Sequence, residues 1–311
     1  NSQEVTQADT IVRSGDQIAV KIKASSEWSG DEQAVLSVGQ TTALVSITTE
    51  STPWKRLANY PIRGISSSFT AGYKIYMGGS GIDNDFTAYD IQSNTWHIIK
   101  SPPNVITGVP PFFSTEGRAF FICPDEDLNI EKIYLYEYHP AEDLWKKITT
   151  YPGNKYSERA NALSVFTVDN KIYTMILNEC YEYDLNLDTW TKKSDFPVST
   201  DSYLLKDYGR FKFSFKGKGY ANVGKRLWQY DPLIDDWKET DSFDEYDDWT
   251  FIKGITIGDY VYMSSHTYQY GFKRYNPITK KREDIPAPKG VVSPGWSYFY
   301  ETLNGKAYER T

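Results

Sequence analysis

The sequence predicts an all-β protein built around a six-bladed β-propeller. Three observations carry this prediction. A stretch from a tyrosine to a tryptophan, first seen as Tyr89–Trp96, returns along the chain with its tyrosines 49, 45, 47 and 45 residues apart. A hairpin turn and a short aromatic strand precede each return, and no stretch has clear helical periodicity. A fixed period of this length is typical of repeat proteins, in which each copy is one supersecondary unit.

The first copy shows why one unit forms short antiparallel strands. Phe86–Tyr89 is rich in β-forming residues. Asp90 follows where its carboxylate can accept backbone N–H groups as the chain turns. Trp96 begins the returning strand and offers a large apolar surface to neighbouring units. With the preceding hairpin, each period holds four strands, as in a propeller blade.

The copies of this unit run almost to the end of the chain. The fifth copy has Arg282 where the others have tryptophan. A sixth blade begins at Trp296 and stops after Tyr308, before its third and fourth strands. Trp54 starts an unassigned outer strand, so the simplest closure has this strand complete the sixth blade. The five preceding blades are predicted at residues 63–99, 109–148, 161–194, 204–240 and 250–285.

Taken together, these residues resemble the kelch repeat. A turn with a Gly-Tyr-Lys-Ile-Tyr strand at residues 72–76, a Tyr-Asp pair, a tryptophan six residues later and a following proline are all present. The resemblance covers residues 54–311, and the propeller domain of galactose oxidase belongs to the same family. The glycine doublet Gly78-Gly79 is kept only in the first blade. The resemblance therefore implies a degenerate kelch-type propeller, residues 51–311.

Residues 1–50 carry no such motif. Alternating stretches at 17–22, 34–38 and 42–47 are separated by Ser, Gly and Asp turns and predict three strands. This segment resembles the second half of an immunoglobulin-like IPT/TIG domain, which often precedes propellers in bacterial surface proteins. The resemblance implies an extracytoplasmic protein. Fifty residues are few for an independent core, so the segment either leans on the propeller or lacks its first half.

Composition excludes some function classes. The net charge is −7, which argues against nucleic acid as a partner because phosphate binding needs a basic surface. No apolar run approaches the length of a membrane span. The chain begins at Asn1 without a visible signal peptide, so we expect a mature or trimmed chain. We also expect a monomer.

Few residues suit metal, redox or cofactor chemistry. His97 and His139 lie inside the repeat motif, which leaves His266 as the one histidine available as a ligand. A copper site would need convergent His and Tyr ligands, so no metal, no cofactor and no redox activity are expected. Cys123 and Cys180 could form a disulfide in an exported protein, but two buried thiols are the preferred interpretation.

The propeller face is the predicted functional region. Loops between the second and third strands and between blades gather at one end of the channel, and loops on a rigid scaffold carry function. Acids, guanidinium groups and aromatic rings around one pocket suit a polyhydroxylated ligand. The predicted ligand-binding residues are Arg63, Asp85, Glu158, Arg159, Arg226, Trp249, His266, Tyr268 and Trp296.

These residues favour a non-catalytic protein whose propeller face binds a carbohydrate. The alternatives are a protein-interaction scaffold at the cell surface, or a small-sugar enzyme resembling the kelch sialic-acid mutarotases. Such an enzyme needs an acid/base pair in the pocket. Glu158 and Arg159 are the candidates for that pair, although no catalytic motif of the family maps onto them.

Overall fold

The structure is a computed structural model of the 311-residue chain. It describes residues 13, 31–38, 40–48, 57–61, 67–78, 85–103, 112–124, 132–153, 163–176, 178–197, 211–223, 225–243, 251–265, 272–285, 300–303 and 306–309. The chain divides into two units, Asn1–Arg56 and Leu57–Thr311.

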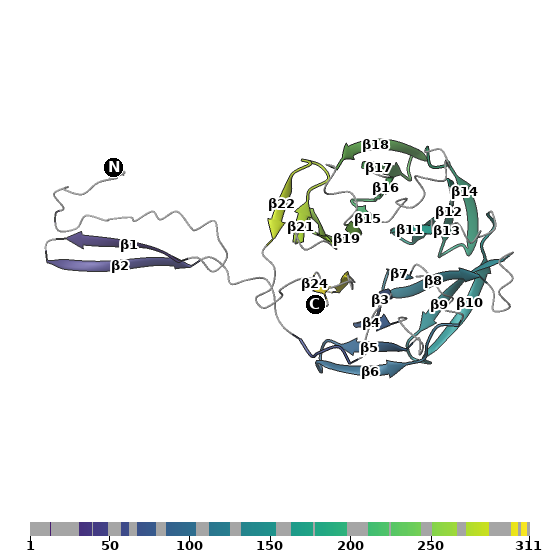
Figure 1. The fold of residues 1–311 in the computed structure, drawn as a ribbon, viewed down its shortest axis with the longest axis horizontal. Helices are drawn as coiled ribbons and strands as arrows, with labels where there is room; N and C mark the ends of the chain where they lie inside the picture. The colour runs from purple at the N-terminus through teal and green to yellow at the C-terminus, as the bar shows by residue number, and fades with distance from the viewer. Residues whose placement is uncertain are drawn as a thin grey trace. The chain divides into compact units, whose positions relative to one another are not determined.

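In the second unit, five four-stranded antiparallel sheets surround a central axis (Figure 1). Each sheet is one blade whose strands lie side by side in chain order, the first innermost. The all-β propeller and its first five blades are therefore confirmed. The blades are β3 (Ser67–Ala71), β4 (Lys74–Gly78), β5 (Phe86–Asp90) and β6 (Thr95–Ile99); β7 (Phe112–Thr115), β8 (Arg118–Pro124), β9 (Ile133–His139) and β10 (Leu144–Thr150); β11 (Leu163–Val168), β12 (Lys171–Ile176), β13 (Glu179–Asp184) and β14 (Thr189–Lys193); β15 (Lys212–Phe215), β16 (Lys218–Val223), β17 (Arg226–Asp231) and β18 (Asp236–Ser242); and β19 (Phe251–Ile257), β20 (Tyr260–Ser265), β21 (Phe272–Tyr275) and β22 (Arg282–Ile285).

The prediction of six complete blades is wrong for the described residues. The sixth sheet has two strands, β23 (Tyr300–Leu303) and β24 (Lys306–Glu309). In this sequence, the Tyr-to-Trp stretch that forms strands three and four of the other blades does not follow β24. The predicted pairing of Trp54 with this sheet lies outside the described residues and stays a prediction.

The ring of innermost strands is closed even so. β3, β7, β11, β15, β19 and β23 contact one another in that order, and β23 also contacts β3. The first and last sheets of the propeller are therefore neighbours, which leaves no open gap between the innermost strands.

The turn between strands three and four is held as the sequence predicts. Asp90 Oδ1 accepts the backbone N–H groups of Gln92 and Ser93 at 2.9 and 3.2 Å. Asn94 ends this turn with a positive φ of 56° and accepts the Tyr89 hydroxyl at 2.5 Å. Asn and Asp tolerate this left-handed conformation better than most residues. The same tyrosine-to-turn bond recurs in the next three blades, from Tyr138 to Asp143, Tyr183 to Asp188 and Tyr230 to Asp235.

Aromatic rings fill the space between blades. Between blades one and two, the Phe69 ring packs edge-on against Trp145 with ring centres 5.3 Å apart. Between blades three and four, Trp237 packs against Phe196 at 4.7 Å, and its indole N–H donates to the Ser194 carbonyl at 3.1 Å. These contacts confirm that the repeat tryptophan joins neighbouring units.

In the first unit, the described residues form one antiparallel hairpin, β1 (Asp31–Val38) and β2 (Thr41–Thr48). Two of the three predicted strands fall within it, and the third, 17–22, lies outside the described residues. The expected β-sandwich-like IPT/TIG segment is not shown, because a sandwich needs two packed sheets and the described residues of this unit form one hairpin. The division into residues 1–50 and 51–311 stays a prediction.

Candidate functional site

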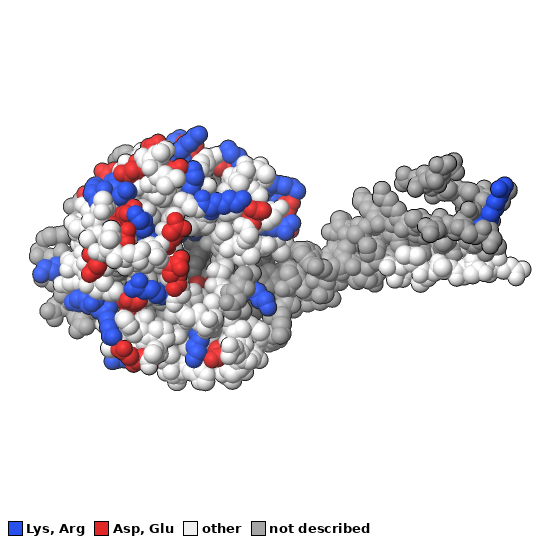
Figure 2. Space-filling view, turned by 180° about the vertical axis from the view of Figure 1, so that it is seen from behind, with Lys and Arg blue, Asp and Glu red and all other residues white. Residues whose placement is uncertain are grey.

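A cavity of about 460 Å³ lies among the six innermost strands of the propeller. Figure 2 shows the propeller hollowed at its centre, with acidic and basic side chains around the opening. The walls combine apolar rings such as Phe112 and Phe213 with hydroxyl groups and three charged residues, Glu116, Lys212 and Glu301. A cavity of this size with a few polar groups is typical of small-ligand sites.

Six hydroxyl residues form a ring in the wall of the cavity. Each stands two residues before the turn that ends its innermost strand, a regularity that follows from the hairpin registers. Sequence analysis did not identify this ring. The signal that could have identified it is the hydroxyl residue that stands two positions before each of these turns. The members of the ring are Thr70, Ser114, Thr167, Ser214, Thr256 and Thr302.

Part of this ring joins neighbouring blades. Ser114 Oγ accepts the backbone N–H of Thr70 at 2.8 Å. The Thr256 hydroxyl donates to the carbonyl of Ser214 at 2.5 Å, and the Ser214 hydroxyl donates to the carbonyl of Thr167. These hydroxyls satisfy backbone groups that face the channel, where no fifth strand pairs with them.

Glu301 is the unusual residue of the cavity. It stands three residues before its turn, where the other innermost strands place the buried side chains Phe69, Phe113, Phe166, Phe213 and Ile255. Its side chain is nevertheless buried, with an exposed fraction of 6%. Glu301 Oε1 accepts the hydroxyl of Ser68, in β3, at 2.7 Å. A buried carboxylate is costly unless it is well paired, and the Ser68 hydroxyl is one of the groups that pair with this one.

Of the predicted ligand-binding residues, two lie among the described residues. Asp85 is exposed immediately before β5, and Arg226 is exposed at the start of β17. Both therefore stand at the start of a third strand, but in blades one and four, which are not neighbours. The Arg226 guanidinium lies 3.6 Å from the Glu239 carboxylate. The remaining seven lie outside the described residues: Arg63, Glu158, Arg159, Trp249, His266, Tyr268 and Trp296.

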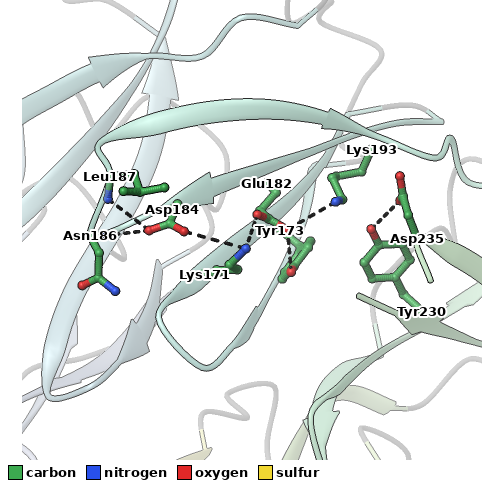
Figure 3. Close-up of polar contacts among 9 residues, drawn as sticks. All are labelled: Lys171, Tyr173, Glu182, Asp184, Asn186, Leu187, Lys193, Tyr230 and Asp235. Carbon is green, nitrogen blue, oxygen red and sulfur yellow. Dashed lines mark hydrogen bonds and ion pairs between the residues drawn. The ribbon is translucent and has the colours of Figure 1, made fainter. Parts of the chain in front are cut away.

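A second polar cluster crosses blade three (Figure 3). Buried Glu182 accepts Lys171 Nζ at 2.5 Å and the Tyr173 hydroxyl at 2.8 Å, and Lys193 Nζ lies 3.6 Å away. Burial alone would raise the pKa of Glu182, but these hydrogen bonds and the lysine charges outweigh it and lower the pKa. The carboxylate is thus paired within its own sheet, so this cluster stabilises blade three and does not face the cavity.

The residues considered for metal and redox chemistry have structural surroundings. His97 Nε2 lies 3.1 Å from the Thr95 hydroxyl, and His139 Nε2 lies 3.7 Å from Glu137. Cys123 and Cys180 are not joined by a disulfide and are buried in different core clusters. Among the residues that the structure describes, no group of His, Cys, Asp and Glu could hold a metal ion. His266 lies outside them.

The described part of the chain has no helix that is both long and apolar enough to cross a membrane.

Comparisons with known proteins do not assign the chain to a family. No family model matches the chain, and no curated protein matches it. One similar solved structure is the extracellular domain of a protein described as a one-component system, from B. thetaiotaomicron. It is 10% identical with a TM-score of 0.45, and the match covers 71% of this chain but 28% of that one. This chain thus spans under a third of the length of that protein.

Proposed function

We propose that this protein is a non-catalytic, extracytoplasmic binding protein whose propeller recognises a carbohydrate. The observation that carries the proposal is the polar cavity of about 460 Å³ inside a closed ring of six strands. Hydroxyl groups and charges of both signs, set among aromatic rings, suit a ligand with many hydroxyls and a weakly apolar ring face. The rigid ring holds these groups in place before the ligand arrives, which lowers the entropy cost of binding.

The predicted loop face is a second part of the proposal, and its two described residues do not line the cavity. Asp85 and Arg226 are exposed at third-strand starts, next to the loops that were expected to contact a ligand. The Arg226 guanidinium lies 3.6 Å from the Glu239 carboxylate, and the two side chains are 65% and 43% exposed. An exposed ion pair contributes little to stability. Arg226 can therefore leave Glu239 and contact a ligand with a small loss of free energy.

The kelch assignment and the extracytoplasmic location belong to this proposal too. The tyrosine-to-turn bonds and the tryptophan N–H bond between blades give the repeated residues the roles expected in a kelch-type repeat. The location rests on the resemblance of residues 1–50 to an IPT/TIG segment.

A glycan screen followed by calorimetry tests the proposal. We expect weak binding, because sugar-stacking sites bury little area per ring. Trp249→Ala should weaken binding with little loss of stability, since exposed loop residues contribute little to a core. Ile98→Ala is the matched control, because Ile98 is 78% exposed in the outer strand β6 and does not line the cavity. No binding of any glycan at millimolar concentration, or unfolding of the Trp249→Ala variant, would contradict the proposal.

A protein partner is the second candidate, and a different surface favours it. Exposed aliphatic side chains stand at the strand three-to-four turns of three successive blades: Leu187 in blade three, Leu233 and Ile234 in blade four, and Ile278 in blade five. Leu233 is 93% exposed. Apolar surface on successive units can mark a protein interaction site. A screen against secreted proteins tests this function, and Leu233→Ser should then remove binding and leave the melting temperature unchanged.

A further inference from the structure

The strand three-to-four turns of blades three and four present apolar side chains to water. Leu187, Leu233 and Ile234 are 70% to 93% exposed. At the position of Leu187 in the turn, blade one has Ser93 and blade two has Glu142, as expected for turns, which favour small polar residues. The turn itself therefore does not require an apolar side chain here. A departure of a sequence from its own local pattern is commonly found at functional sites.

The backbone of both turns holds these apolar residues in place. Asp184 Oδ1 accepts the backbone N–H of Leu187 at 3.1 Å. In blade four, Asp231 Oδ1 accepts the backbone N–H of Leu233, also at 3.1 Å. A partner that buries these side chains therefore meets a backbone that is already ordered, which lowers the entropy cost of binding.

The two turns lie at the same end of the propeller in neighbouring blades. Both blades have the same order of four antiparallel strands around the axis, so their strand three-to-four turns point the same way. The outer parts of the two blades also contact each other. Asp235, at the end of the blade-four turn, accepts the backbone N–H of Ser194, just after β14, at 2.9 Å. A single partner surface can thus reach both turns.

Acidic side chains flank the apolar residues of both turns. Asp188 follows Leu187 directly, Asp236 stands two residues after Ile234, and both aspartates are exposed. Asp188 accepts the Tyr183 hydroxyl, and no lysine or arginine of the described residues forms an ion pair with either aspartate. A partner with lysine or arginine beside its apolar residues is complementary to this pattern. A second copy of this chain, or an anionic membrane, would instead bring like charges together.

The turn of blade five marks the boundary of this pattern. Ile278 is 65% exposed there, but Lys280 and Lys281 follow it where the other two turns have aspartates. A basic partner would be repelled at this turn, so we expect Ile278 to contribute less than Leu233 to binding.

We propose that the turns of blades three and four form a docking surface for a protein partner whose contact region combines apolar side chains with lysine or arginine. The surface consists of Leu187, Asp188, Leu233, Ile234 and Asp236. This inference rests on the protein-partner function given above as the second candidate, and it adds the chemistry of the partner. The apolar side chains supply buried area, and the carboxylates accelerate association and select the partner.

A phage library of random short peptides, selected on the full chain, tests the inference. The enriched peptides should combine apolar residues with lysine or arginine. The best of them, made synthetically, should bind the Leu233→Ser variant at least ~10-fold more weakly than the wild type, with no change in melting temperature. Asp236→Lys should weaken binding and reduce its dependence on salt. Ile98→Ser is the matched control, because Ile98 is 78% exposed in β6, outside the turns, and it should bind as the wild type does.

The inference is overturned if no peptide is enriched, if the enriched peptides are acidic, or if they bind Leu233→Ser as tightly as the wild type. A lower melting temperature of Leu233→Ser would show that the leucine is structural, and an equal loss of affinity in Ile278→Ser would contradict the charge pattern. Leu233-dependent binding to phosphatidylcholine and phosphatidylglycerol vesicles would assign the surface to a membrane instead. The broader function is judged separately. An acidic secreted partner that is lost on Leu233→Ser would sustain it and still overturn this inference.

Discussion

At the scale of single residues, the acceptor at the end of the strand three-to-four turn does two tasks in blades one, two and four. Asp235 accepts the Tyr230 hydroxyl at 2.6 Å and the backbone N–H of Ser194, in the preceding blade, at 2.9 Å. Asn94 does the same in blade one, for Tyr89 and for the N–H of Ala58. One side chain therefore fixes its own turn and joins it to the neighbouring segment.

This double role predicts a large effect of Asp235→Ala. The variant leaves the buried Tyr230 hydroxyl without its acceptor and puts alanine at a φ of 51°, so we expect a loss of about 3 kcal/mol in unfolding free energy. Asp235→Asn should cost much less, because Asn94 shows that the amide fits. Asp236→Ala, at an exposed neighbouring position, is the control. Urea unfolding of the four proteins checks the order, and equal stability of Asp235→Ala and wild type would contradict it.

The buried tyrosines also predict how stability depends on pH. Burial, with the nearby Asp143 and Asp90 charges, raises the pKa of Tyr76 from 10.0 to about 12. The pKa values of Tyr138 and Tyr230 are raised still further. Burial is the largest cause, and hydrogen bonds to turn carboxylates are the second. A folded-state pKa above the unfolded value means that the unfolded chain releases these protons first. Their contribution is thus complete below pH 10, the ordinary tyrosine value, and is lost as the pH rises through the folded-state values.

Spectrophotometric titration of tyrosine ionisation, combined with thermal melts, measures this effect. We expect constant stability just below pH 10 and a steady fall above it, with a group of tyrosines that ionises only as the fold opens. A titration in which every tyrosine ionises in one step near pH 10, with the fold intact, would contradict the prediction.

At the scale of elements, blade five shows how a unit survives without its tryptophan. The Arg282 guanidinium donates to the Ser242 carbonyl at 3.0 Å and to Asp241 at 3.1 Å. It also lies over the Phe243 ring, 4.7 Å from its centre. The first of these contacts matches the bond that Trp237 makes to Ser194. Because Lys280 stands where other blades have an acidic or amide acceptor, Tyr275 donates to Asp241 of the preceding blade instead, at 2.7 Å.

The substitution series at Arg282 tests this equivalence. Arg282→Ala should lose about 2–3 kcal/mol, since it removes charge-assisted bonds and a cation–π contact. Arg282→Trp should retain more stability than Arg282→Ala, because the indole restores the ring packing and the N–H donor of the other blades. Lys281→Ala, on an exposed neighbour, should be close to neutral. Chemical unfolding measures the series, and a Trp variant less stable than the Ala variant would show that Arg282 is not a replacement for tryptophan.

At the scale of the whole molecule, the segment before blade one is expected to secure the ring. Leu57, Ala58 and Tyr60 pack against a buried cluster of blade one, and Trp96 of blade one and Leu303 of the sixth sheet pack against the same cluster. The Trp96 indole N–H donates to the Ala58 carbonyl at 3.2 Å. In blade four, the Trp237 indole N–H makes the equivalent bond to the Ser194 carbonyl. Ser194 directly follows the fourth strand of blade three. Ala58 thus stands where the other blades place the residue after an outer strand.

Deletion of residues 51–60 is therefore expected to abolish cooperative folding, because it removes the cover of the first and last sheets together. Deletion of residues 1–50 is the control and should leave the unfolding transition of the propeller unchanged, which also tests the predicted domain division. Differential scanning calorimetry of the two shortened proteins gives the comparison. A sharp transition after the 51–60 deletion would contradict this role of the segment.

The sequence by itself determined the repeat unit, because the contacts that define a blade are local. The Tyr89 bond to Asn94 spans five residues, and the turn bonds of Asp90 span two and three, so a fixed spacing was enough to predict strands, turns and the first five blades. The tertiary structure alone decided the closure of the ring and the candidate site. Glu301 and Ser68 are 233 residues apart, and only the circular order of the blades brings β23 against β3. The same glutamate at the end of an open row of sheets would lie in water, whereas inside the closed ring it is a buried charge facing a cavity.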